Sequence, residues 1–191
     1  MSTATKVKGF FAGVEGDQGS ENPPLLPVKV SDGAPPENKW LVHIVEGRVE
    51  VRHATQDDHP YISFAVAVDE PAEYEGRMVF GMFFPPREPD ADADDRAVAS
   101  HASQSKRFVG QIDAILGTGT TAGAPGDDLE ETLVDLVGLL ENSSFVAKIG
   151  LERGKKIDPT DTAKDAPRHP DRNRIAYYYP ADEWDSPDPE N

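Results

Sequence analysis

The chain has 191 residues, of which 37% are hydrophobic and 28% are charged, and it contains no cysteine. That length suits one domain with extensions, and the lack of cysteine excludes disulfide bonds and thiolate metal sites. The formal net charge of −16 argues against binding nucleic acid through the molecule as a whole, because phosphate binding needs local positive charge.

Charge is unevenly distributed along the chain. Residues 89–144 carry three basic and eleven acidic side chains, whereas residues 145–179 carry eight basic and five acidic ones. Residues 180–191 then carry five acidic side chains and no basic one. Because no apolar run approaches the ~20 residues of a membrane helix, we expect no membrane segment, and the cysteine-free composition fits a reducing cytoplasm.

The first strand is predicted at residues 39–52, KWLVHIVEGRVEVR. Before it, residues 1–38 are rich in Gly, Pro, Asn and Asp and are expected to form a flexible extension. One strand face carries Trp40, Val42 and Ile44, and beyond Gly47 the apolar positions shift to Val49 and Val51. A glycine at such a phase change predicts a β-bulge, which bends the strand.

Two more strands are predicted before the helices. Segment 61–70, YISFAVAVDE, places Ile62, Phe64, Val66 and Val68 on a buried face. Segment 77–85, RMVFGMFFP, forms the third strand and ends at a pair of prolines. We expect Phe64, Phe80 and Phe145 to lie in the core, since strand aromatics are usually buried.

Two helices follow. The first is capped by Asp94 or Asp95 and ends at Gly117, and the second begins near Asp127, which has Glu130 three residues later in a capping-box pattern. Each helix has an apolar stripe whose spacing places it on one helix face. In the first helix the stripe is Phe108, Val109, Ile112, Ile115 and Leu116. In the second helix it is Leu129, Leu133, Leu136, Val137 and Leu140.

The chain returns to strands at residues 144–155 and 172–180, joined by a long polar loop. Three strands, two helices and two strands, with a bulged first strand, predict a mainly β, α+β domain over residues 39–180. The expected architecture is a five-stranded barrel of the oligonucleotide/oligosaccharide-binding (OB) type, with both helices between strands three and four. A sandwich-like or mixed α+β sheet is the alternative. Residues 181–191 are expected to be a disordered acidic tail.

Several motifs occur in a characteristic order: YEGRMVF, FVGQIDAILG, DLEETLVDLVGLLENSSFVAKIGLERGK and PDRNRIAYYYP. Over roughly residues 40–180 the chain resembles an uncharacterised family of small bacteriophage and prophage proteins. That family is similar to phage single-stranded-DNA-binding proteins and is associated with replication and recombination. The resemblance implies a phage protein that acts in the bacterial host cytoplasm.

Binding single-stranded DNA without reading its sequence needs a cationic groove and aromatic faces on which bases stack. The predicted cationic residues are Arg52, Arg77, Lys148, Arg153, Lys155, Lys156, Arg172 and Arg174. The candidate stacking residues are Trp40, Tyr61, Phe83, Phe84, Tyr177 and Tyr178, of which Tyr61 and Tyr178 are assigned to the site. The alternative is that these aromatics are core residues and that the basic loop is simply solvated.

The acidic end has two interpretations. Asp182, Glu183, Trp184 and Asp185 are predicted to bind replication or recombination proteins, with the tryptophan as an apolar anchor. The tail would also compete with DNA for the cationic groove. The alternative is a solubilising end without a partner.

Catalytic and metal-binding motifs were sought without success. Five histidines show no ligand spacing, and His53 and His59 around Asp57 and Asp58 are read as a charged turn. We therefore expect a non-enzymatic DNA-binding protein without metal or cofactor, and leave its oligomeric state open. The alternatives are a phage protein-interaction or assembly module and a metal-dependent nuclease that uses scattered acidic residues.

Overall fold

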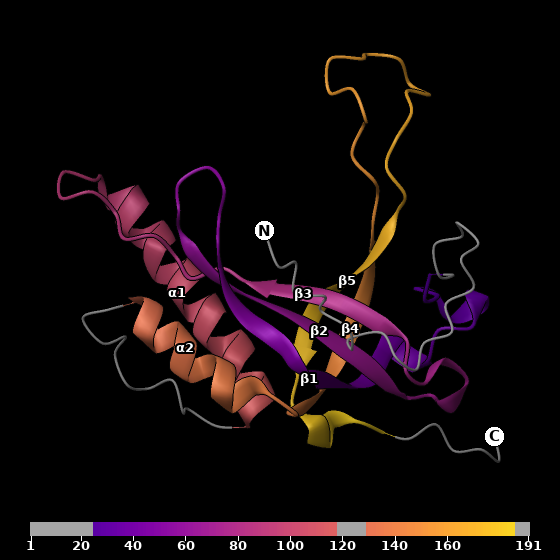
Figure 1. The fold of residues 1–191 in the computed structure, drawn as a ribbon. Helices are drawn as coiled ribbons and strands as arrows, with labels where there is room; N and C mark the ends of the chain where they lie inside the picture. The colour runs from indigo at the N-terminus through magenta and orange to yellow at the C-terminus, as the bar shows by residue number, and fades with distance from the viewer. Residues whose placement is uncertain (1–24, 118–128, 186–191) are drawn as a thin grey trace, which may run out of the picture.

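Five strands and two helices make up the fold in the computed structural model, which describes residues 25–117 and 129–185 (Figure 1). Their order is β1 (Lys39–His53), β2 (Pro60–Glu70), β3 (Met78–Phe83), α1 (Asp95–Leu116), α2 (Leu129–Leu140), β4 (Ser144–Glu152) and β5 (Arg172–Tyr179). The predicted types and order of these elements are confirmed, and the chain is a mixed α+β protein.

The strands form one antiparallel sheet in the order β3-β2-β1-β4-β5. Strand β1 is central because it is long and bent: its pairing with β2 shifts register between Ile44 and Val49, and Gly47 between them has a φ of 68°. The predicted bulge is thereby confirmed. No hydrogen-bonded ladder joins β3 to β5 among the described residues, so the sheet is open and the expected closed barrel is not seen.

The edges of the open sheet nevertheless come close together. The rings of Phe83 on β3 and Tyr178 on β5 have centroids 5.2 Å apart. Trp40, Phe64 and Phe145 are buried in the same core. The sheet is therefore curved enough for its two edge strands to share a hydrophobic core.

The helices cover one side of the sheet, where they lie next to each other (Figure 1). The Asp94 carboxylate accepts a hydrogen bond of 2.7 Å from the Ala97 backbone N–H, and Gly117 ends α1 with a φ of 81°. Both ends of α1 are as predicted. The buried helical residues come from the predicted stripes: Ile112, Ile115, Leu133, Leu136 and Leu140. The predicted cap Asp127 lies outside the described residues.

Strand β3 corrects one prediction. Phe80 is 66% exposed, although we expected it in the core, while Phe83 is fully buried. The reason is Gly81, whose missing side chain makes room for the ring of Phe64; a Cβ there would collide with that ring. Since Gly81 must face inward, its neighbours Phe80 and Met82 face outward.

The N-terminal segment that the structure describes is packed against β5. Leu26 is buried, its N–H donates to Asn173 Oδ1 over 2.7 Å, and its carbonyl accepts from Asn173 Nδ2 over 3.1 Å. The expectation of a flexible extension therefore does not describe residues 25–38. Residues 1–24 lie outside the described residues.

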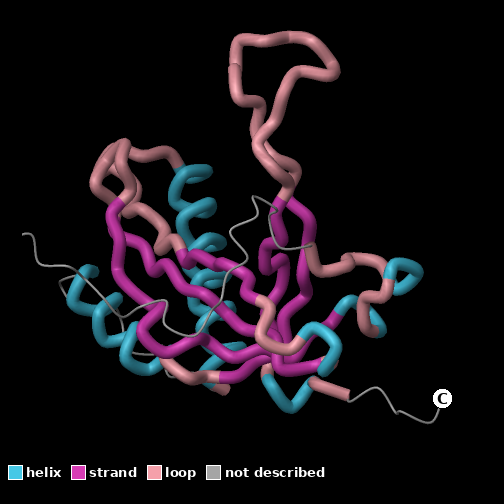
Figure 2. Tube along the Cα trace, turned by 45° about the vertical axis from the view of Figure 1, so that its right-hand side comes forward, coloured by secondary structure: helices cyan, strands magenta, loops and turns pink. Residues whose placement is uncertain are grey.

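The chain between β4 and β5 forms an arm, residues 153–171, that projects away from the sheet (Figure 2). The Gly154 N–H donates to Asp171 Oδ1 over 2.8 Å, and the His169 N–H donates to the Lys155 carbonyl over 2.9 Å. A Cβ on Gly154 would collide with the His169 carbonyl, so only glycine lets the two sides of the arm approach this closely. The two sides of the arm are thus held together at its base by backbone and side-chain hydrogen bonds.

Candidate nucleic-acid interface

A groove of about 1050 Å³ lies between the edge strands β3 and β5. One wall is the outer face of β3, and the other is β5 with the base of the arm; Leu25 and Leu26 complete the lining. The outward side chains of β3 and its continuation are exposed by 43% to 66%, and we call this row the β3 platform: Met78, Phe80, Met82 and Phe84. A contiguous exposed apolar row of this kind marks a binding surface.

Tyr61 extends the β3 platform onto β2. Its ring stacks on Phe84, with centroids 4.7 Å apart and planes inclined by 22°. Tyr61, predicted to belong to the site, and Phe84, a predicted stacking candidate, therefore lie together at the outer surface. Phe80 was missed, because the sequence does not show which face of β3 is buried.

Three of the predicted arginines line the groove: Arg77, Arg172 and Arg174. The Arg77 guanidinium lies 5.0 Å from the Tyr74 ring centre, and Arg172 Nε donates to Glu152 Oε2 over 2.9 Å. The Arg172 hydrogen bond holds the pKa of Glu152 below its usual value. Arg174 is exposed, and no carboxylate of the described residues lies within 4.0 Å of its guanidinium.

The other predicted cations do not line this groove. Arg52 Nε donates to Glu50 Oε1 over 2.7 Å, and Lys148 lies on β4. Lys156 Nζ donates to the Asp161 carbonyl over 2.6 Å, so it holds the arm together rather than facing a ligand. Arg153 and Lys155 are exposed at the base of the arm. Cations that are close together in the sequence therefore have different roles in the structure.

Three predicted stacking residues belong to the core or pack against it: Trp40, Phe83 and Tyr178. Tyr178 packs its ring 5.2 Å from Phe83 and 5.6 Å from Phe145, and burial raises the pKa of its hydroxyl. Trp40 is fully buried, and its indole N–H donates to Asn38 Oδ1 over 2.7 Å. The rings of Trp40 and Phe83 are therefore unavailable to a base, and the Tyr178 ring is largely occupied by its core contacts. Tyr177 is 61% exposed, so it is the outward tyrosine of β5.

The start of the acidic tail is packed rather than detached. Residues Ala181–Glu183 form a 3-10 turn, and Lys39 Nζ lies 3.1 Å from Glu37 Oε2 and 3.9 Å from Glu183 Oε2. The hydrogen bond to Glu37, followed by the other charges, raises the pKa of Lys39. Trp184 is partly buried, while Asp182 and Asp185 are exposed. Residues 186–191 lie outside the described residues.

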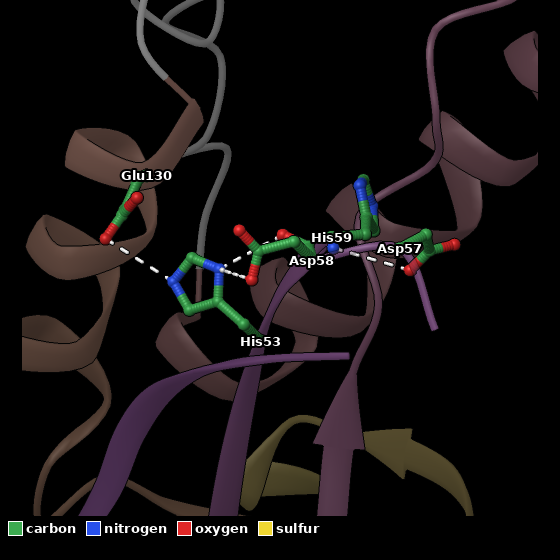
Figure 3. Close-up of polar contacts among 5 residues, drawn as sticks. All are labelled: His53, Asp57, Asp58, His59 and Glu130. Atoms are coloured by element: carbon green, nitrogen blue, oxygen red, sulfur yellow. Dashed lines mark hydrogen bonds and ion pairs between the residues drawn. The ribbon is translucent and has the colours of Figure 1, made fainter. Parts of the chain in front are cut away.

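The charged turn between β1 and β2 contacts α2. His53 Nδ1 lies 3.0 Å from the Asp58 carbonyl oxygen, and His53 Nε2 lies 3.5 Å from Glu130 Oε1 (Figure 3). His59 Nε2 lies 2.9 Å from the Pro85 carbonyl oxygen. Within residues 25–117 and 129–185, no three acidic or histidine side chains are grouped closely enough to hold a metal ion. Through these contacts the turn joins the end of β1 to α2 and to the chain that follows β3.

His53 should make stability depend on pH. The Asp58 carbonyl hydrogen bond, then the Glu130 and Asp58 carboxylates, raises the pKa of His53 above the value near 6.5 of an unperturbed histidine. The stabilisation of the folded state by the contacts of protonated His53 is therefore fully present below about pH 6.5 and is lost as the pH rises through the raised pKa. We expect His53→Gln to lower Tm more at about pH 5.5 than at about pH 8.5.

The matched control for that measurement is His101→Gln on α1, since no ion pair of His101 occurs among the described residues. Because this substitution removes no ion pair among the described residues, its Tm should stay close to that of wild type. An equal effect of His53→Gln at the two pH values would contradict the assigned contacts.

Comparisons with protein-family models, curated proteins and solved structures find no match to this chain. In the described part of the chain, no helix is both long and apolar enough to span a membrane.

Proposed function

We propose that the protein binds single-stranded DNA, without reading its base sequence, in the groove between β3 and β5. One observation carries the proposal: in a molecule of net charge −16, the exposed β3 platform and the exposed Arg174 of β5 line the same groove, where Arg172 is paired with Glu152. Bases stack on aromatic faces, and arginines pair with phosphates, so the two walls match the two parts of a nucleotide chain.

The strand arrangement supports the same function. A five-stranded sheet in the order β3-β2-β1-β4-β5, with a bulged β1 that pairs on both sides and with adjacent edge strands, is consistent with a partly open OB barrel. In that architecture the face of strands two and three, with the 1–2 and 4–5 loops, holds oligonucleotides. In this comparison the β3 platform and Tyr61 correspond to that face, and the arm corresponds to the 4–5 loop.

The biological setting is part of the proposal. The resemblance to phage single-stranded-DNA-binding proteins supports a role in phage replication or recombination in the host cytoplasm. Asp182, Trp184 and Asp185 would then recruit a replication or recombination protein. Because Glu183 is next to Lys39 and not in the groove, residues 181–185 do not block the proposed DNA site.

A protein-interaction module is the second candidate, because an exposed apolar row also suits a partner protein. The two functions differ in their dependence on salt. Phosphate binding releases counterions and weakens steeply as salt rises, whereas an apolar protein contact does not.

Removing groove arginines tests the proposal. Arg77→Ala with Arg174→Ala should weaken oligo-dT binding by roughly tenfold or more near physiological salt, and should reduce the slope of log affinity against log salt by about one per arginine. Arg96→Ala, an exposed arginine in the first turn of α1 that does not line the groove, is the matched control. Unchanged affinity and slope in the double variant would place the site elsewhere.

A further inference from the structure

A second groove, of about 580 Å³, lies between α1 and β5. Helix α1 contributes Lys106, Arg107, Gly110 and Gln111, and β5 contributes Arg174, Ile175, Ala176, Tyr177 and Tyr178. The two pockets have three lining residues in common, namely Arg174, Ile175 and Tyr178. The two grooves therefore adjoin across β5, with Arg174 at the crossing.

The second groove is lined by exposed cations. Lys106, Arg107 and Arg174 are exposed, and none makes an ion pair with any carboxylate that the structure describes. Other arginines of the protein are neutralised: Arg52 by Glu50, and Arg172 by Glu152. Three exposed cations around one concave surface of an acidic molecule form a local attractive field for a polyanion.

The remaining lining suits a nucleotide chain rather than a small anion. Tyr177 is 61% exposed at the groove and offers a ring face to a base. Gly110 lies within α1, where glycine lowers helix stability, and a Cβ there would meet no atom within 4 Å. Among the described residues, no packing contact therefore requires glycine at this position of the groove.

We infer that single-stranded DNA leaving the β3 platform crosses β5 at Arg174 and continues along α1, where Lys106 and Arg107 bind its phosphates and Tyr177 stacks with a base. This second stretch rests on the single-stranded-DNA function proposed above, and it makes the total site longer than the groove between β3 and β5. A short oligonucleotide occupies the first groove, whereas a long one reaches both.

Oligonucleotide length distinguishes the two stretches. Oligo-dT of about 5 and about 16 nucleotides, which span the site sizes of single OB domains, is titrated by fluorescence anisotropy at two salt concentrations. For the long oligonucleotide, Lys106→Ala with Arg107→Ala should lower affinity roughly tenfold at low salt and reduce the salt slope by about one to two. For the short one, affinity should remain within about twofold of wild type.

The control is Arg96→Ala, which removes an exposed cation from the same helix away from the groove. It should behave as wild type with both lengths, and circular dichroism should show all variants folded. If the double variant binds the long oligonucleotide as wild type does, or loses equal affinity for both lengths, the α1 stretch is wrong and the proposed function stands. If wild type binds neither oligonucleotide, the proposed function itself fails.

Discussion

Phe80→Ala is expected to weaken binding of oligo-dT by roughly five- to 150-fold while leaving the free energy of unfolding nearly unchanged. Base–aromatic stacking contributes about 1–3 kcal/mol per base, and Phe80 is the most exposed ring of the β3 platform. Because 66% of the residue is in contact with water, its removal creates no internal cavity. Fluorescence anisotropy measures the affinity, and urea denaturation measures the stability.

The matched control is Val134→Ala, which truncates a 55% exposed apolar side chain on α2, outside the groove between β3 and β5. It should alter neither quantity appreciably. If Phe80→Ala left DNA binding intact, the β3 platform would not be the stacking surface, and the protein-interaction function would become the better explanation of its exposure.

Trp40→Ala is expected to lower the free energy of unfolding by about 3–5 kcal/mol, the usual cost of deleting a large aromatic side chain from a core. Trp40 is fully buried at the start of β1, where its ring meets the edge of Tyr74 at 5.2 Å and its N–H is satisfied by Asn38. Urea or guanidinium denaturation followed by circular dichroism gives the value, and it also reports whether the variant is folded at all.

The chain offers a matched control for this substitution, since it contains two tryptophans. Trp184 lies in the tail segment and is only partly buried, so Trp184→Ala should cost less than Trp40→Ala by at least about 2 kcal/mol. A small stability loss for Trp40→Ala, combined with weaker DNA binding, would instead support the original hypothesis that Trp40 stacks on bases.

Local patterns predicted much of the fold. The phase change at Gly47 fixed the bulge of β1, and the cap at Asp94 with the glycine at 117 bounded α1. These features follow from backbone chemistry within a few residues, which sequence shows directly. The approach of β3 to β5 depends on the curvature of the whole sheet, and this is why sequence did not determine whether the barrel closes.

Strands with large apolar residues on both faces limited the prediction of the site. In RMVFGMFF every position other than Arg77 and Gly81 is large and apolar, so alternation could not select the inward face. The inward face of β3 is determined by Phe64, which pairs with Gly81 from the neighbouring strand β2 and whose ring fills the space over that glycine. The run of three tyrosines in β5 has the same ambiguity. Alternation alone did not show that Tyr177 is the exposed ring and that Tyr178 packs against the core.

The sequence did not show which cations are free to bind a ligand, because some of them pair with residues distant in the sequence and others donate to backbone carbonyls. Arg172 meets Glu152 across a β ladder, and Lys156 is satisfied by carbonyls of the arm. Lys106 and Arg107 were overlooked because they lie in a strongly acidic stretch, residues 89–144. Net charge along the chain is therefore a poor guide to the field at a folded surface.

A fluorescence titration of the wild-type protein with oligo-dT at about 50 and about 200 mM salt tests the central claim most directly. We expect saturable binding whose affinity falls by roughly tenfold or more between the two salt concentrations, because several phosphate contacts would be made. Absence of binding at low salt, or an affinity that does not change with salt, would contradict it.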